Sequence, residues 1–203
     1  MCIRDRDVTD FKKLNKSEFE FISGYSKVKL MFYRNDIFRI WLAQDGEYTN
    51  PAGNAIVVDY GKKNPSVSVS ENSRYYRFST PACVVRVYKK PLRFALYDKA
   101  DKKMIFEEKE PLSFGAKTYQ TLKRGGKEYF YGGGMQQGRF SHGGTDLDIS
   151  ITGWHEDQVS NPVPFYMSSN GYGVFRNTFA PGKYSFSGVG QVAAEDGMKI
   201  EYS

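Results

Sequence analysis

Residues 27–42 read KVKLMFYRNDIFRIWL. In the first half of this stretch, Val28, Leu30 and Phe32 recur at every second position, which is the period of a β-strand with one buried face. The dipeptide Arg-Asn that follows favours a tight turn, and residues 36–42 (DIFRIWL) have the composition of a second strand. The stretch therefore predicts two successive antiparallel strands.

Similar runs of strand length recur along the chain, separated by turn signals such as Asp45-Gly46 and the glycine pair within residues 124–127. They lie at residues 55–60, 66–70, 74–79, 83–88, 92–97, 104–106, 117–122, 128–131, 146–151, 164–167, 173–176 and 183–186. Only residues 10–22 (DFKKLNKSEFEFI) could form a helix. Many short antiparallel strands with regular turns predict an all-β fold, an antiparallel two-sheet β-sandwich.

Length and composition agree with one compact domain. The chain has 203 residues, of which 16% are aromatic, and aromatic side chains favour the pleated, half-buried surface of a sheet. A chain of this size can bury a core without disulfides or a metal. No linker rich in glycine, serine or proline divides it. We interpret residues 1–6 (MCIRDR) as an artefactual leader and residues 7–203 as a single β-sandwich domain.

Several classes of partner are not expected. The net charge is +6, but lysine and arginine are scattered rather than clustered, so no nucleic-acid partner is predicted. No apolar run approaches the ~20 residues of a membrane helix. The few cysteines and histidines, Cys2, Cys83, His142 and His155, do not form a zinc-site pattern, and Cys83 reads as a small buried thiol. We expect no metal, no cofactor and no membrane contact.

Three motifs that resemble catalytic or phosphate-binding sites have simpler interpretations. Gly132-Gly-Gly-Met lacks the Lys-Ser/Thr and helix of a phosphate loop, so it predicts a bulge or a close backbone passage. Ser141 and His142 are sequence neighbours without an orienting third group, which is not a nucleophile–base arrangement. Asp146 and Asp148 alternate with apolar residues, which places both carboxylates in water.

Residues 154–157 (WHED) form an irregular polar segment between two predicted strands. Loops on a rigid sandwich often carry ligand contacts. A tryptophan ring can stack on a sugar, and carboxylates can accept hydrogen bonds from its hydroxyl groups. The residues alone leave two interpretations open: a sugar-binding loop, or a packed surface loop.

Residues 128–186 resemble the end of the N-terminal β-sandwich domain of glycoside hydrolase family 31, the α-glucosidase and α-xylosidase family. Two segments carry most of the resemblance: residues 131–136 (YGGGMQ), similar to a glycine turn of that family, and residues 164–177 (PFYMSSNGYGVFRN). Earlier strands, including residues 85–98, are similar more weakly. The resemblance covers roughly residues 20–190.

The resemblance implies a galactose mutarotase-like sandwich that precedes a (β/α)₈ barrel. In that family the barrel supplies an aspartate nucleophile, in a Trp-x-Asp-Met-Asn motif, and a second aspartate as acid/base. This chain has no such motif, so no catalytic residue is assigned to it. The resemblance therefore implies the substrate-loop domain of a retaining α-glycosidase that hydrolyses O-glycosidic bonds of α-glucosides, with the C-terminal barrel missing.

In the family, a loop of the sandwich contributes to the sugar pocket. Thr152 fits the pattern of that loop, whereas Gly153 stands where the family has an aspartate. The substrate-binding residues implied are Thr152, Trp154, Glu156 and Asp157, with an α-glucoside oligosaccharide as ligand. A free-standing, non-enzymatic carbohydrate-binding sandwich is the alternative, and an interaction module without a sugar role is a third. A sandwich without its barrel is also expected to expose an apolar docking face and to be poorly soluble.

Overall fold

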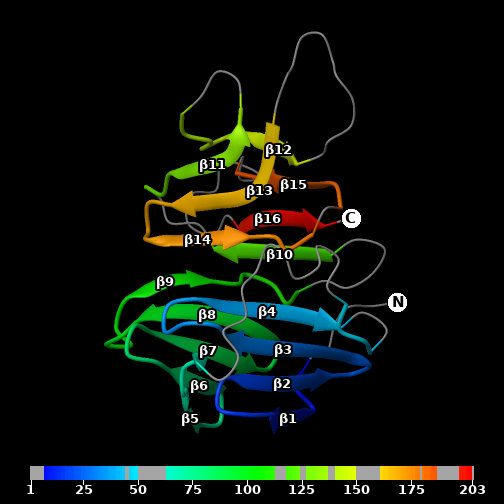
Figure 1. The fold of residues 1–203 in the computed structure, drawn as a ribbon, viewed down its shortest axis with the longest axis vertical. Helices are drawn as coiled ribbons and strands as arrows, with labels where there is room; N and C mark the ends of the chain where they lie inside the picture. Colours follow the sequence, from blue (N-terminus) through cyan, green and yellow to red (C-terminus); the bar gives the residue numbers. More distant parts are fainter. Residues whose placement is uncertain are drawn as a thin grey trace. The chain divides into compact units, whose positions relative to one another are not determined.

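The computed structural model describes residues 7–43, 46–49, 63–112, 118–123, 127–136, 140–149, 161–178, 180–186 and 197–202. The regular elements in these ranges are β-strands, and every strand pair is antiparallel (Figure 1). The described ranges contain no α-helix, and therefore none that could span a membrane. The prediction of an all-β, antiparallel fold is confirmed.

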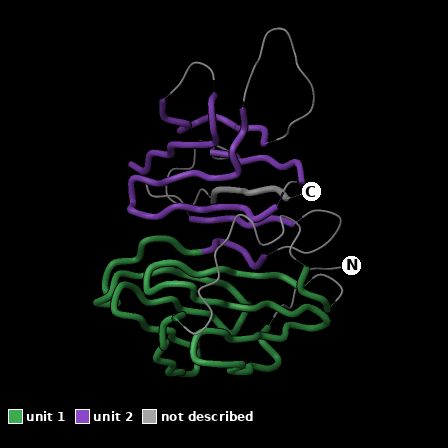
Figure 2. Tube along the Cα trace, in the orientation of Figure 1, with its two compact units in different colours: residues 1–107 green, residues 108–203 purple. Residues whose placement is uncertain are grey.

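The chain divides into two compact units, residues 1–107 and residues 108–203 (Figure 2). Within the described residues, the strands of each unit form two sheets. Two compact units can belong to one domain, so the single domain over residues 7–203 stays a prediction.

Unit 1, residues 1–107, contains two meanders, in which each strand pairs with the next one along the chain (Figure 1). The first sheet consists of β1 (Asp10–Lys13), β2 (Glu18–Ser23), β3 (Ser26–Phe32) and β4 (Phe38–Ala43). The second consists of β5 (Ser68–Glu71), β6 (Tyr75–Ser79), β7 (Cys83–Lys89), β8 (Leu92–Asp98) and β9 (Met104–Glu107). The predicted run at residues 55–60 lies outside the described residues.

The two sheets of unit 1 pack through fully buried phenylalanines. Phe19 and Phe21 come from β2, and Phe78 and Phe94 come from the facing sheet. The Phe19 and Phe78 rings are 4.7 Å apart between centroids, and the Phe21 and Phe94 rings are 6.2 Å apart. Contacts of this kind contribute both buried apolar area and favourable ring geometry. Unit 1 is thus a sandwich with an aromatic core.

The expectation that residues 10–22 could form a helix is wrong, because they form β1, a turn and β2. Phe19 and Phe21 are two positions apart, so only a strand places both rings in the core. At the turn, the Asn15 side chain accepts a hydrogen bond from the Ser17 amide at 2.9 Å, and the Leu14 amide donates to the Glu18 carbonyl. Burial of the aromatic face decides against the weak helical propensity.

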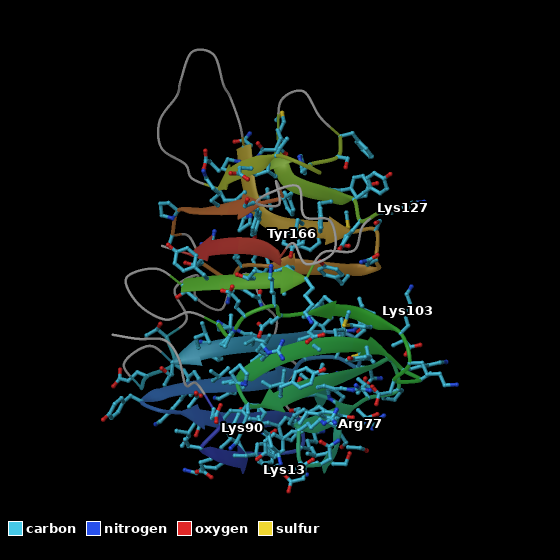
Figure 3. All side chains as sticks on the ribbon, turned by 180° about the vertical axis from the view of Figure 1, so that it is seen from behind. Lys13, Arg77, Lys90, Lys103, Lys127 and Tyr166 are labelled. Carbon is cyan, nitrogen blue, oxygen red and sulfur yellow. The ribbon has the colours of Figure 1, made fainter. Side chains whose placement is uncertain are left out.

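Unit 2, residues 108–203, has one sheet in the order β10-β16-β15-β12 and another in the order β11-β13-β14. The strands are β10 (Thr118–Lys123), β11 (Phe130–Met135), β12 (Asp146–Ile149), β13 (Asn161–Ser168), β14 (Tyr172–Phe175), β15 (Gly182–Ser185) and β16 (Gly197–Tyr202). Strand β16 was not among the predicted runs. Tyr166 of β13 lies inside this unit (Figure 3), and its ring is 5.1 Å from Tyr184 and 5.3 Å from Phe186 between centroids.

Cys83 begins β7 and is buried, as the sequence predicts for a small thiol in a strand. Burial raises the pKa of this thiol above its ordinary value. A thiol with a raised pKa holds little thiolate at neutral pH, so Cys83 has a structural role rather than a reactive one.

Asp98 provides a pH-dependent contribution to the stability of unit 1. Its carboxylate accepts hydrogen bonds from the Lys102 amide at 2.8 Å and the Lys103 amide at 3.1 Å. These backbone donors lower the pKa of Asp98 below its ordinary value. A lowered pKa in the folded state means that the contribution is present above the unfolded pKa, about 3.9, and is lost as pH falls through the folded value.

We therefore expect wild-type protein to be more stable than Asp98→Asn above about pH 5, and this difference to shrink steadily below about pH 4. The stability difference is measured from the urea unfolding midpoints of both proteins, at pH values from about 2 to about 7 in steps of about one pH unit. A difference that is the same at both ends of this range contradicts the assignment.

Candidate functional site

The four residues predicted to contact sugar, Thr152, Trp154, Glu156 and Asp157, lie outside the described residues. The described chain ends at Ile149 of β12 on one side and resumes at Asn161 of β13 on the other. The role of the four residues therefore stays a prediction, and the structure describes the two strands that flank them. We call residues 150–160 the candidate loop.

The strand before the candidate loop, β12, has the predicted alternation. Leu147 and Ile149 are buried, whereas Asp146 and Asp148 are exposed. Asp146 accepts a hydrogen bond from the Ser185 hydroxyl at 2.6 Å, and Asp148 lies 3.6 Å from the Lys183 ammonium group. The expectation that both carboxylates face water is confirmed, and β12 is fixed by its apolar side and by its pairing with β15.

The strand after the candidate loop, β13, is held on both sides, because it pairs with β11 and with β14. Its first residue, Asn161, is opposite Met135, and Pro162 is opposite Gly134. A central strand with two partners has a well-defined register. The first residue of β13, Asn161, therefore has a fixed position beside the end of β11.

The glycine run of β11 allows the backbones of β11 and β13 to approach each other closely. Gly132, Gly133 and Gly134 all have positive φ, at 108°, 76° and 85°, and the register shifts between Gly132 and Gly134. A Cβ on Gly134 would lie 2.0 Å from the Asn161 carbonyl oxygen. The run is therefore a β-bulge with a close backbone passage, which confirms the prediction made from the sequence.

Side chains from the following segment hold the bulge in place. The His142 ring nitrogen Nε2 lies 2.8 Å from the Gly132 carbonyl oxygen, and Gln136 donates a hydrogen bond to the Gly133 carbonyl at 2.8 Å. His142 is buried, and its ring stacks on Phe186 with centroids 6.1 Å apart. Its ring therefore positions backbone, which agrees with the prediction that Ser141 and His142 are not a catalytic pair.

A buried carboxylate at the other end of β11 was missed by the sequence analysis. Glu128 is only 3% exposed, and the Ser168 hydroxyl of β13 donates a hydrogen bond to it. Tyr172 of β14 lies beside them. Burial, and after it the Glu128 charge, raises the pKa of the Tyr172 phenol. The sequence around Glu128, Lys-Glu-Tyr, is typical of an exposed segment. Only the tertiary contacts therefore reveal that Glu128 is buried.

In the part of the chain that the structure describes, no group of three histidine, cysteine, aspartate or glutamate side chains is placed to hold a metal ion. The described residues instead fix the two strands on either side of residues 150–160, which are β12 through its pairing with β15 and β13 through its pairing with β11 and β14.

Comparison with known proteins shows the family to which this sandwich belongs. Residues 27–184 match the model of the glycosyl hydrolase 31 N-terminal galactose mutarotase-like domain. Alpha-glucosidase 2 of Bacillus thermoamyloliquefaciens is 28% identical over 169 residues, which are 81% of this chain and 21% of that protein. The chain thus spans about a fifth of this curated relative.

Solved structures show the same fold. The Flavobacterium johnsoniae GH31 dextranase complexed with glucose superposes with a TM-score of 0.80 at 23% identity, over 97% of this chain and 25% of that one. The cycloalternan-forming enzyme from Listeria monocytogenes, in complex with a pentasaccharide substrate, gives a TM-score of 0.75 at 17% identity, over 98% and 19% of the two chains. A GH31 α-xylosidase from a soil metagenome, complexed with xylose, gives 0.73 at 18% identity, over 95% and 30%.

Proposed function

Because the chain belongs to the family of glycosyl hydrolase 31 N-terminal galactose mutarotase-like domains, we propose that it is the substrate-loop domain of a retaining α-glycosidase. The resemblance stated from the sequence is confirmed, as is the galactose mutarotase-like β-sandwich. The observation that carries the proposal is the extent of the family match, residues 27–184, which includes the candidate loop and both of its flanking strands.

The proposed substrate is an α-glucoside oligosaccharide. The relatives that support this class are the Bacillus alpha-glucosidase, the dextranase complexed with glucose, and a variant of that dextranase complexed with isomaltotriose. The reaction centre itself, two carboxyl groups about 5 Å apart in a retaining enzyme, belongs to polypeptide outside this chain. We propose that this polypeptide is a C-terminal (β/α)₈ barrel.

Within this function, the candidate loop orients the sugar. The Trp154 ring stacks on the apolar face of the sugar ring, and Glu156 or Asp157 accepts hydrogen bonds from hydroxyl groups that do not react. Thr152 adds a hydroxyl group that hydrogen-bonds the sugar. The strands β12 and β13, fixed as described above, support this role because a sugar is oriented only by groups that are themselves held in place.

The test uses the whole protein that the gene encodes, with isomaltotriose as substrate. We expect Trp154→Ala, and at least one of Glu156→Gln and Asp157→Asn, to lower kcat/KM about tenfold or more, the loss expected for one hydrogen bond to a charged group or one stacked ring. Asp148→Asn is the matched control, because its carboxylate is 76% exposed on β12, and it should change kcat/KM less than about twofold. Unchanged kcat/KM in all three loop variants contradicts the proposal.

A separate measurement distinguishes the free-standing carbohydrate-binding alternative. The proposal expects the 203-residue chain alone to bind isomaltotriose too weakly to measure, because one loop supplies only one side of a pocket. Isothermal titration of the chain with isomaltotriose measures this. Binding with a dissociation constant of roughly 10 μM or lower would favour the free-standing binding module instead, provided that Trp154→Ala abolishes this binding.

A further inference from the structure

The two strands on either side of residues 150–160 belong to different sheets of unit 2. Strand β12 is in the sheet β10-β16-β15-β12, and β13 is in the sheet β11-β13-β14. The strands β11, β12 and β13 lie together at one end of this unit (Figure 1). The distance between Ile149, the last residue of β12, and Asn161, the first residue of β13, therefore depends on how the two sheets are held against each other.

The glycine bulge of β11 contacts both of these strands. On the β12 side, a Cβ on Gly133 would lie 2.6 Å from the Cδ1 atom of the buried Leu147, so the β11 backbone packs directly on this side chain. On the β13 side, Gly134 passes close to the Asn161 carbonyl group. The bulge therefore lies between the two strands and separates them by the width of one backbone.

The turn at His142 bonds this bulge to both sheets. The His142 amide donates to the Phe130 carbonyl of β11 at 2.9 Å. The ring nitrogen Nε2 donates to the Gly132 carbonyl at 2.8 Å, because a carbonyl oxygen can only accept. Two residues further on, the Gly144 amide donates at 3.0 Å to the carbonyl of Phe186, which directly follows β15 in the other sheet.

We propose that His142 is a positioning residue for sugar binding, because it holds the bulge that sets the spacing between the ends of β12 and β13. This inference rests on the proposed function and deepens it. A loop that joins two sheets keeps its side chains oriented for a sugar only while the spacing of the two strand ends is fixed. His142 acts through backbone, since it is 4% exposed and its ring stacks on Phe186.

A contribution of His142 to stability alone is the competing explanation. Its replacement would then lower activity by the same factor whether or not the candidate loop can contact sugar. A positioning residue that acts through the loop instead loses its effect once the sugar contact of Trp154 has been removed. A double-mutant cycle between His142 and Trp154 therefore separates the two explanations.

The test uses the whole protein that the gene encodes, with isomaltotriose as substrate. His142→Phe keeps a ring against Phe186 but removes the donor to Gly132, and we expect it to lower kcat/KM about fivefold or more. In protein that already carries Trp154→Ala, the same replacement should lower kcat/KM less than about twofold. His142→Gln should stay within about threefold of wild type, because its amide group can donate where Nε2 does.

Ser168→Ala is the control for general destabilisation of unit 2. Its hydroxyl donates to the buried Glu128 at the end of β13 that is remote from Asn161, so the replacement loosens this unit without touching the bulge. We expect Ser168→Ala to change kcat/KM less than about twofold.

Gln136→Ala is a milder variant, which keeps the test decisive if His142→Phe does not fold. The Gln136 amide group donates to the Gly133 carbonyl at 2.8 Å and is the second side chain that holds the bulge. We expect its removal to lower kcat/KM about threefold in the wild-type background and less than about 1.5-fold beside Trp154→Ala.

Three results overturn the proposal. The first is unchanged kcat/KM in the variants that release the bulge, and the second is an equal loss with and without Trp154→Ala. The third is a loss in Ser168→Ala as large as that in His142→Phe, which would assign the effect to stability. Failure of the proposed function is distinguishable, because Trp154→Ala, Glu156→Gln and Asp157→Asn would then each leave kcat/KM unchanged when made alone.

Discussion

Replacing Gly134 with alanine is expected to destabilise unit 2 by about 4 kcal/mol, the size of effect seen when backbone strain and overpacking coincide. The positive φ of 85° alone disfavours any residue with a side chain. The new Cβ would also lie 2.0 Å from the Asn161 carbonyl oxygen and 2.6 Å from the Val163 nitrogen. Both are backbone atoms, so no rotamer change relieves the clash and β11 must move away from β13.

Gly171→Ala is the matched control for this prediction. Gly171 has nearly the same φ, 87°, but an added Cβ there would meet no other described atom within 4 Å. It should therefore cost only the conformational strain, about 1 kcal/mol. Hydrogen exchange of the β13 amides in increasing urea measures both variants. Equal losses in the two variants would show that the close passage between β11 and β13 is not the cause.

The second large effect is expected for Phe78→Ala in unit 1, with a loss of about 3–5 kcal/mol. Phe78 is fully buried, and its ring contacts those of Phe19 at 4.7 Å and Phe21 at 5.8 Å between centroids. Removing the ring leaves a cavity between the two sheets that several rigid aromatic neighbours cannot fill. Phe78→Leu keeps most of the volume and should cost less, about 1–2 kcal/mol.

Urea unfolding followed by far-UV circular dichroism, together with hydrogen exchange of the β7 amides, measures the Phe78 variants. Tyr25→Ala is the control, because Tyr25 is 95% exposed in the turn between β2 and β3 and should change stability by less than about 0.5 kcal/mol. A Phe78→Ala variant as stable as Tyr25→Ala would mean that the two sheets of unit 1 are not held together through this ring.

Strands with alternating polarity could be predicted from the sequence because burial of one face leaves a period of two. The stretch at residues 27–42 predicted β3 and β4 nearly to their ends. The same pattern in Phe19 and Phe21 was outweighed by the lysines and glutamates of residues 10–22, which read as a possible helix. What decides that segment is the facing sheet, which contributes Phe78 and Phe94 and is more than 50 residues away in sequence.

The candidate site could be predicted from the sequence only in part. The glycine run predicted a bulge or a close backbone passage, because glycine has no side chain to pack in an ordinary strand. The burial of Glu128 and of His142 could not be predicted, since both depend on partners that come from other strands or turns. The roles of Thr152, Trp154, Glu156 and Asp157 come from resemblance alone and stay predictions.

The pairing order of the strands has a consequence for synthesis on the ribosome. In unit 1 each strand bonds to its neighbour in sequence, so both sheets can close as soon as Glu107 has left the exit tunnel. In unit 2, β10 (Thr118–Lys123) pairs with β16 (Gly197–Tyr202). The β10 edge that bonds to β16 therefore remains unpaired until Tyr202 has been synthesised. Unit 1 is therefore expected to be folded while unit 2 is still incomplete, and a translational pause within unit 2 would expose an unpaired edge to chaperones and proteases.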